Sequence, residues 1–90
     1  MYDFRWIAWN VSHIARHGVT PAEAEYVVNH ARPPFPRRIE DDKRLVWGQT
    51  ADGAYLQVIY VLDPDDAVFV IHAMPMTQKQ KRQFRRRRRR

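Results

Sequence analysis

The chain has 90 residues, no cysteine and a formal net charge of +6, which predicts one small domain and excludes disulfides and thiolate metal sites. No stretch reaches the ~18 consecutive apolar residues of a membrane span, and the first residues lack the basic-then-apolar order of a secretion signal, so we expect a cytoplasmic protein. Nine of the 16 basic residues follow Thr77 with no acidic residue among them, which leaves residues 1–77 with a net charge of −3. The charge that favours a polyanionic partner therefore lies at the C-terminal end.

The first predicted helix covers residues 9–18. Asn10 is expected to cap its free amides, and Trp9, directly before the cap, to pack on Ile14 as a hydrophobic staple. Gly18 can adopt the left-handed conformation that ends a helix. The basic and imidazole side chains that precede Gly18 should then lie at the carboxyl end of this helix.

A second predicted helix follows at once. Thr20 caps it, Pro21 takes the first helical position, and Glu23 reaches back to complete a capping box. The proline-rich segment 32–36 ends it, because proline restricts the residue before it and cannot continue the hydrogen-bond ladder. Residues 35–39 are compatible with a short edge strand after this helix.

Three strands are predicted next, over residues 44–50, 55–62 and 67–73. The middle one is the longest run of β-branched and aromatic residues without a proline, which is typical of a buried central strand. The pair Asp52-Gly53 tolerates the positive φ angles of a tight hairpin between the first two strands. The pattern predicts an antiparallel meander.

A third helix is predicted from the capping-box pattern of Thr77 to Gln80 onward, as far as Phe84. The arginine run 85–90 should repel itself and form a disordered tail. The chain is thus expected to be a single domain over residues 1–84. Its fold class is α+β, with two N-terminal helices, an antiparallel sheet of three to four strands and a C-terminal helix.

Three short stretches occur in an order and spacing that point to a family. They are Arg16-His17-Gly18-Val19-Thr20, Arg44-Leu45-Val46-Trp47-Gly48 and Ile71-His72-Ala73, ahead of a basic end. Together they resemble the BrnT family of toxins from type II toxin-antitoxin systems, over residues 9–84. The resemblance implies a RelE-like fold, ribonuclease activity that inhibits translation without a cofactor, and neutralisation by a ribbon-helix-helix antitoxin of the BrnA type, with a possible homodimer inside that complex.

One position departs from the family pattern. After the last strand the family usually carries an arginine that is thought to face the RNA phosphate, and this chain has Met74 there. Two functions therefore stay open: an endoribonuclease, or a catalytically weakened nucleic-acid-binding module that acts with its antitoxin as an autorepressor. A third and weaker hypothesis is a basic protein that associates with RNA through its tail alone.

Cleaving RNA without a metal requires a base, an acid and cations that stabilise the charged transition state. The candidate catalytic residues are His17, Arg16, Arg44 and His72, and the candidate RNA-binding residues are Lys43, Lys79, Lys81, Arg82 and Arg85. The sequence does not fix whether Arg44 and His72 share a face of the sheet, because the strand register decides that.

Structural interpretations compete with each catalytic role. His17 is also explained by the negative end of a helix, Arg44 by a charged strand entry, and His72 by a hydrogen-bonded place in the core. His13 and His17 have the spacing of a metal pair, but no third ligand is evident, so a metal site is disfavoured.

The three tryptophans also have two interpretations. Trp6, Trp9 and Trp47 could stack on RNA bases, yet large aromatic side chains in a small domain mostly fill the core. We assign Trp47 to the core.

Overall fold

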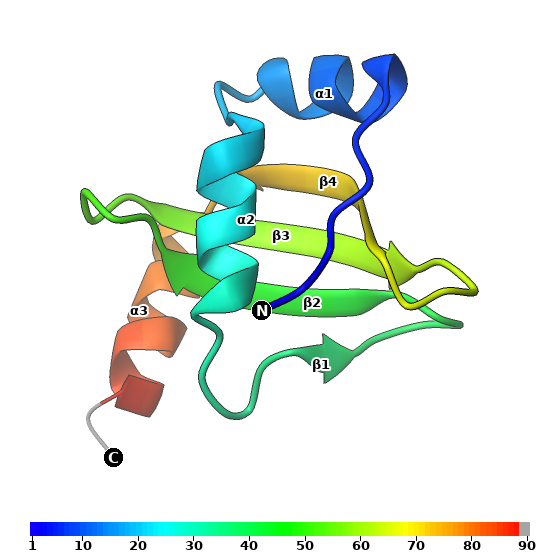
Figure 1. Ribbon diagram of the computed structural model, residues 1–90. Coiled ribbons are helices and arrows are strands. Elements are labelled where there is room, and N and C mark those ends of the chain that lie inside the picture. The colour runs from blue at the N-terminus through cyan, green and yellow to red at the C-terminus, as the bar shows by residue number, and fades with distance from the viewer. Residues whose placement is uncertain (89–90) are drawn as a thin grey trace.

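The computed structural model describes residues 1–88, in which three helices accompany one antiparallel sheet of four strands (Figure 1). The helices are α1 (Ala8–Ala15), α2 (Pro21–Asn29) and α3 (Gln78–Arg88). The strands are β1 (Arg37–Arg38), β2 (Arg44–Gln49), β3 (Tyr55–Leu62) and β4 (Val68–Pro75), and they lie in the order β1-β2-β3-β4. The predicted α+β class and the antiparallel meander are confirmed. The edge strand β1 covers only two residues of the segment 35–39 that is compatible with a strand.

The register of the strands divides the side chains of the sheet between two faces. Directly paired residues of antiparallel strands point to the same face, and neighbours along a strand alternate. We call the face that α2 covers the front face; it carries Arg44, Val46, Gly48, Leu56, Val58, Tyr60, Val68, Val70 and Ala73. The back face carries Leu45, Trp47, Tyr55, Gln57, Ile59, Val61, Phe69, His72 and Met74.

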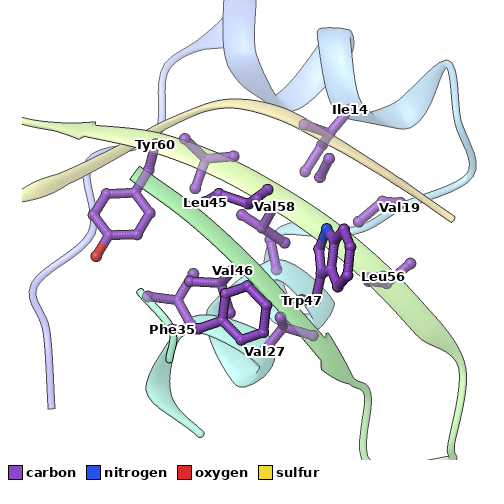
Figure 2. Close-up of a cluster of buried hydrophobic side chains, with 14 of the residues drawn as sticks. Ile14, Val19, Val27, Phe35, Leu45, Val46, Trp47, Leu56, Val58 and Tyr60 are labelled. Carbon is purple, nitrogen blue, oxygen red and sulfur yellow. The ribbon is translucent and has the colours of Figure 1, made fainter. Parts of the chain in front are cut away.

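The main core lies between α2 and the front face (Figure 2). Val27 of α2 and Val46 and Val58 of the sheet are almost entirely buried. A Cβ atom at Gly48 would lie 3.1 Å from Cγ1 of Val27, so the absence of a side chain there allows α2 to approach β2 closely. Gly48 is therefore one of the residues that determine how closely α2 packs on the sheet.

A smaller aromatic cluster packs α3 against one end of the back face. Phe84 of α3 contacts Tyr55 of β3 edge-on, with ring centroids 6.1 Å apart, and also lies near Phe35. Phe35 in turn packs on Trp47, which is buried as assigned from the sequence. Because α3 meets the Tyr55 end, the side chains of Ile59, Val61, Phe69, His72 and Met74 remain partly exposed on the rest of this face.

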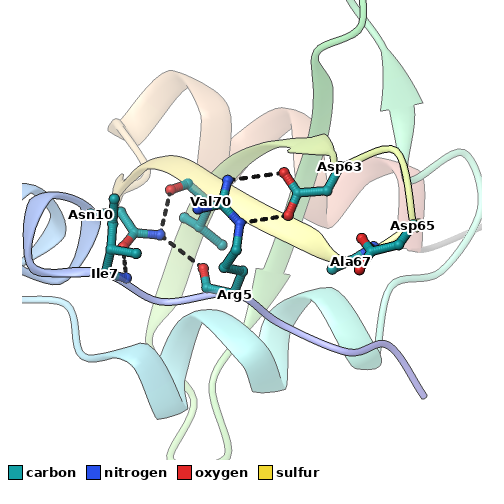
Figure 3. A network of polar contacts seen from close by, with 7 residues as sticks. All are labelled: Arg5, Ile7, Asn10, Asp63, Asp65, Ala67 and Val70. Carbon is teal, nitrogen blue, oxygen red and sulfur yellow. Dashed lines mark hydrogen bonds and ion pairs between the residues drawn. The ribbon is translucent and has the colours of Figure 1, made fainter.

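The start of α1 differs from the prediction. The helix begins at Ala8 and its N-cap residue is Ile7, so Asn10 is not the N-cap but the third helical residue, and it is fully buried. Its amide oxygen accepts from the backbone N–H of Ile7 at 2.8 Å, and its amide nitrogen donates to the carbonyl oxygens of Arg5 and Val70 (Figure 3). The chain before α1 passes along the edge of β4, and this polar anchor stabilises the helix where a cap was expected. Trp9 stays half exposed.

The predicted starts of the other two helices are confirmed, and so is the turn at Gly18. Both capping boxes form, Thr20 with Glu23 and Thr77 with Gln80, and Gly18 ends the first helical segment with φ +73°. α3 continues through Arg88, four residues into the segment predicted to be a disordered tail, and the rest of that segment lies outside the described residues. Within residues 1–88, every helix is too short or too polar to cross a lipid bilayer.

Candidate functional site

Three histidine rings meet where the end of α1 approaches β4. The ring centroids of His17 and His72 lie 5.5 Å apart with the rings nearly perpendicular, and those of His13 and His72 lie 6.3 Å apart. His17 is exposed, whereas His13 and His72 are half buried. The structure thus brings together two of the predicted catalytic residues and adds His13, which the sequence offered only as half of a disfavoured metal pair.

Local backbone features place these rings. The N–H of His17 donates to the carbonyl oxygen of Ile14 at 3.0 Å, and Gly18 then turns the chain toward α2. On β4, Ile59 pairs with His72 but the next residue of β3 pairs with Val70, so one extra residue bulges out of the ladder. A bulge of this kind redirects neighbouring side chains. It lies directly beside His72.

The electrostatics of the cluster favour a neutral imidazole at His72. Burial lowers the pKa of His72 below its ordinary value of 6.5, and the nearby rings of His17 and His13 lower it further. An imidazole with a lowered pKa is free of its proton at neutral pH and can accept one. Arg16, the next predicted site residue, is exposed beside His17 at the carboxyl end of α1.

Arg44 does not join this cluster. It pairs with Tyr60 on the front face, two strands away from His72, which lies on the back face. Arg44 is half buried next to Tyr60 in the sheet. Burial raises the pKa of the Tyr60 hydroxyl to about 12, and the positive charge of Arg44 offsets part of that rise. The buried Nε of Arg44 has no hydrogen-bond partner among the described residues.

The predicted RNA-binding residues separate into two groups. On α3, Lys79 and Arg82 are exposed, while Lys81 and Arg85 lie over the ring of Tyr55 at 5.6 and 5.7 Å. These four cations border the end of the back face that α3 covers. Lys43 is elsewhere, in the loop after β1.

The Nζ atom of Lys43 lies 3.1 Å from a carboxylate oxygen of Glu40. An exposed ion pair of this type neutralises the local charge without adding much stability. Lys43 is therefore a weaker candidate for binding phosphate than the cations of α3.

An aromatic row extends from the histidine cluster along α1 and β4. Trp9 is stacked on His13, with ring centroids 5.0 Å apart and planes 10° apart, and also lies parallel to Phe69 at 6.2 Å. The guanidinium of Arg5 lies 4.2 Å from the centre of the Phe69 ring. The sequence contains a signal for this row, since Trp9, His13 and His17 recur every four residues and share one side of a helix.

A separate pocket of about 530 Å³ opens between the end of α2 with the loop after it, the end of β2 with its hairpin, and Phe84 of α3. Its walls include Tyr26, His30, Arg32, Trp47 and Phe84. None of the predicted catalytic residues lines it. The pocket is thus distinct from the histidine cluster.

No protein-family model matches this chain, and neither does any curated protein or solved structure. Among residues 1–88, no group of three or more histidine, aspartate or glutamate side chains is arranged to hold a metal ion. The site consists of the half-buried imidazole of His72, the imidazole of His17 in contact with it, and cations at both ends of the partly exposed back face.

Proposed function

We propose that the protein is a metal-independent endoribonuclease and the toxin of a type II toxin-antitoxin pair. The observation that carries the proposal is the contact between His17 and His72, whose ring centroids lie 5.5 Å apart. Two adjacent imidazoles provide the proton acceptor and the proton donor that RNA cleavage by its own 2′-hydroxyl requires. The resemblance to BrnT toxins, two of whose three matching stretches contain these residues, supports the same activity.

The reaction assigns one role to each imidazole. The neutral ring of His72 takes the proton of a ribose 2′-hydroxyl, whose oxygen bonds to the adjacent phosphorus. The bond from phosphorus to the 5′-oxygen breaks, and the protonated ring of His17 donates its proton to that oxygen. The products are a 2′,3′-cyclic phosphate and a 5′-hydroxyl. Arg16 stabilises the negative charge of the transition state from beside His17.

The experiment that tests this activity is incubation of the full-length protein with end-labelled RNA in EDTA. Defined fragments with 2′,3′-cyclic phosphate ends would support the proposal. Intact RNA, or activity that appears only when a divalent metal is added, would contradict it. The same protein expressed in a bacterial cytoplasm should arrest growth, and co-expression of a cognate ribbon-helix-helix antitoxin should relieve the arrest.

Arg44→Ala is expected to leave the rate of RNA cleavage within about threefold of wild type, because Arg44 lies on the opposite face from His72 and contributes nothing to the transition state there. This differs from the expectation drawn from the sequence, which included Arg44 among the candidate catalytic residues. The measurement is the initial rate in EDTA at a temperature where circular dichroism shows both proteins folded. A loss of two orders of magnitude would return Arg44 to the site.

A second function, RNA binding without cleavage, is favoured by one observation. Met74, which stands where the resemblance implies an arginine, lies on the back face opposite Gln57 and one position away from His72 along that face. If the missing cation is essential, the protein binds RNA and represses transcription with its antitoxin. Met74→Arg should then create cleavage or toxicity that the parent protein lacks, whereas a parent that already cleaves RNA would exclude this alternative.

Both functions predict that the cations of α3 contribute salt-dependent RNA affinity. Replacing the exposed residues Lys79 and Arg82 with alanine should make the plot of log affinity against log salt shallower by about 1.4, since each lost phosphate contact on a single strand contributes about 0.7. The measurement is fluorescence anisotropy of a labelled oligonucleotide between low and physiological salt. Lys43→Ala, which removes a cation already paired with Glu40, is the matched control and should leave the slope unchanged.

A further inference from the structure

The surface beside the histidine cluster holds a tryptophan that the fold does not bury. Trp9 is 52% exposed, and two apolar neighbours are also exposed in part, Ile7 directly before α1 and Val11 on α1. A tryptophan side chain offers a large apolar area that folding normally removes from water. Leaving it at the surface, next to residues proposed to act on RNA, points to a ligand with a flat face.

The indole of Trp9 is held in place by neighbouring rings. His13 stacks against it, and Phe69 of β4 lies parallel to it with a plane angle of 12°. Phe69 is itself covered by the guanidinium of Arg5, which donates two hydrogen bonds to the carboxylate of Asp63, at 2.7 and 3.0 Å (Figure 3). A ring fixed by such contacts loses little conformational freedom when a ligand stacks on it.

Ring contacts join Trp9 to the proposed reaction centre without a gap. Trp9 contacts His13, His13 contacts His72, and His72 contacts His17. A base lying on Trp9 would therefore belong to a nucleotide close to the phosphate that the two imidazoles act on. Single-stranded RNA exposes bases that can stack on aromatic side chains, whereas the bases of a duplex are already stacked on each other.

We propose that Trp9 is the stacking platform for an unpaired base of the RNA, next to the phosphate that is cleaved. The proposal rests on the function proposed above and names the part of the substrate that the site grips. The charges around the platform fit this ligand: Arg16 is an exposed cation, and the carboxylate of Asp63, which would repel RNA, is neutralised by its ion pair with Arg5. It also implies a preference for single strands over duplexes that the cations of α3 alone would not produce.

The test measures binding separately from cleavage. A fluorescein-labelled single-stranded RNA with 2′-O-methyl groups throughout cannot be cleaved through the 2′-oxygen, and its affinity for the full-length protein is read by anisotropy. Trp9→Ala should weaken binding roughly 5- to 150-fold, the range for losing one stacked base. Trp9→Phe keeps a ring and should restore most of the affinity. The affinity for a duplex of the same sequence should not change.

The matched control is Val11→Ala, which alters another exposed apolar side chain of α1 that lies outside the aromatic row. It should leave single-strand binding at the wild-type value. Equal single-strand affinities of Trp9→Ala and wild type would overturn the proposal, and so would an equal loss of single-strand and duplex binding. If Trp9→Ala and Val11→Ala both leave RNA binding intact but both prevent binding of the antitoxin, the surface is a protein-binding face and the proposal is again wrong.

Cleavage experiments with unmodified RNA distinguish a failure of the Trp9 platform from a failure of the proposed ribonuclease activity. Wild-type cleavage together with unchanged RNA binding by Trp9→Ala would remove the platform and keep the ribonuclease. Trp9-dependent binding of the modified RNA without cleavage of the unmodified RNA would keep the platform and remove the ribonuclease. A wild-type protein that neither binds the modified RNA nor cleaves the unmodified RNA would contradict both the platform and the ribonuclease activity.

Discussion

Replacing His72 with alanine is expected to lower the rate of RNA cleavage by about 10²- to 10⁴-fold, the usual contribution of a positioned base or acid. His17→Ala should have an effect of the same order, because its ring is the proton donor in contact with that base. The two losses should not add in the double variant, since the groups act in one proton-transfer sequence. The measurement is the initial rate in EDTA with end-labelled RNA.

His30 provides the matched control for both substitutions. It is exposed at the end of α2, stacked on Tyr26 and outside the histidine cluster. His30→Ala should cleave RNA at nearly the wild-type rate. Should His72→Ala and His30→Ala have the same activity, the cluster would not be the reaction centre.

The pH dependence of cleavage should identify His72 as the base. The base must be unprotonated, so the rate should fall on the acid side as His72 takes up a proton. Because burial and the two neighbouring histidines lower the pKa of His72, this fall should be centred below the ordinary value of 6.5. An acid limb centred above 6.5 would contradict the assignment.

The same pKa shift affects stability, with a sign that follows from linkage. The folded state binds fewer protons at His72 than the unfolded state does, so the free energy of unfolding increases with pH across the interval between the two pKa values. The protein should accordingly lose stability as the pH falls through 6.5 and below. This pH-dependent loss should be smaller in His72→Ala.

Asn10→Ala should lower the free energy of unfolding by about 2–4 kcal/mol, a large effect for a substitution that removes so few atoms. The side chain is fully buried and makes hydrogen bonds to the backbone of Ile7, Arg5 and Val70 (Figure 3). Alanine would leave the carbonyl of Val70 and the N–H of Ile7 without these partners. Urea denaturation of the two proteins measures the difference.

Asn29→Ala is the control for this substitution. Asn29 ends α2 and accepts one hydrogen bond from the backbone N–H of Tyr2 in an exposed position, so its loss should cost less than about 1 kcal/mol. An Asn10→Ala protein as stable as wild type would show that α1 does not depend on this anchor. Since α1 carries His13 and leads directly into the turn that holds His17, the Asn10 variant should also cleave RNA more slowly at temperatures where it is still folded.

The arrangement of elements could be predicted because local patterns and the fold agree. The β-branched run over 55–62 is β3, the capping residues Thr20 and Thr77 begin helices, and Gly53 adopts φ +92° in the predicted hairpin. Each of these features depends on neighbours within a few residues. Interactions between residues that are close in the chain can be predicted directly from the sequence.

The start of α1 was predicted incorrectly for the opposite reason. Asn10 has the side chain of a helix cap, but its amide is used by Val70, 60 residues later in the chain. Trp9 has a large apolar side chain of the kind that usually fills a core. It lies in the first turn of α1 beside Phe69 of β4, and this position leaves it half exposed. In both cases contacts with β4, which is distant in the sequence, decided the position of the side chain.

What the sequence by itself determined is therefore the order and type of the elements, the separation of charge toward the C-terminal end, and the residue types able to transfer protons. Only the tertiary structure decided which of them act together. The strand register places Arg44 on the front face and His72 on the back face, and the packing of α1 against β4 brings His17 to within ring contact of His72. Register and packing depend on contacts between distant parts of the chain, and a shift of one residue in a strand would reverse the assignment of faces.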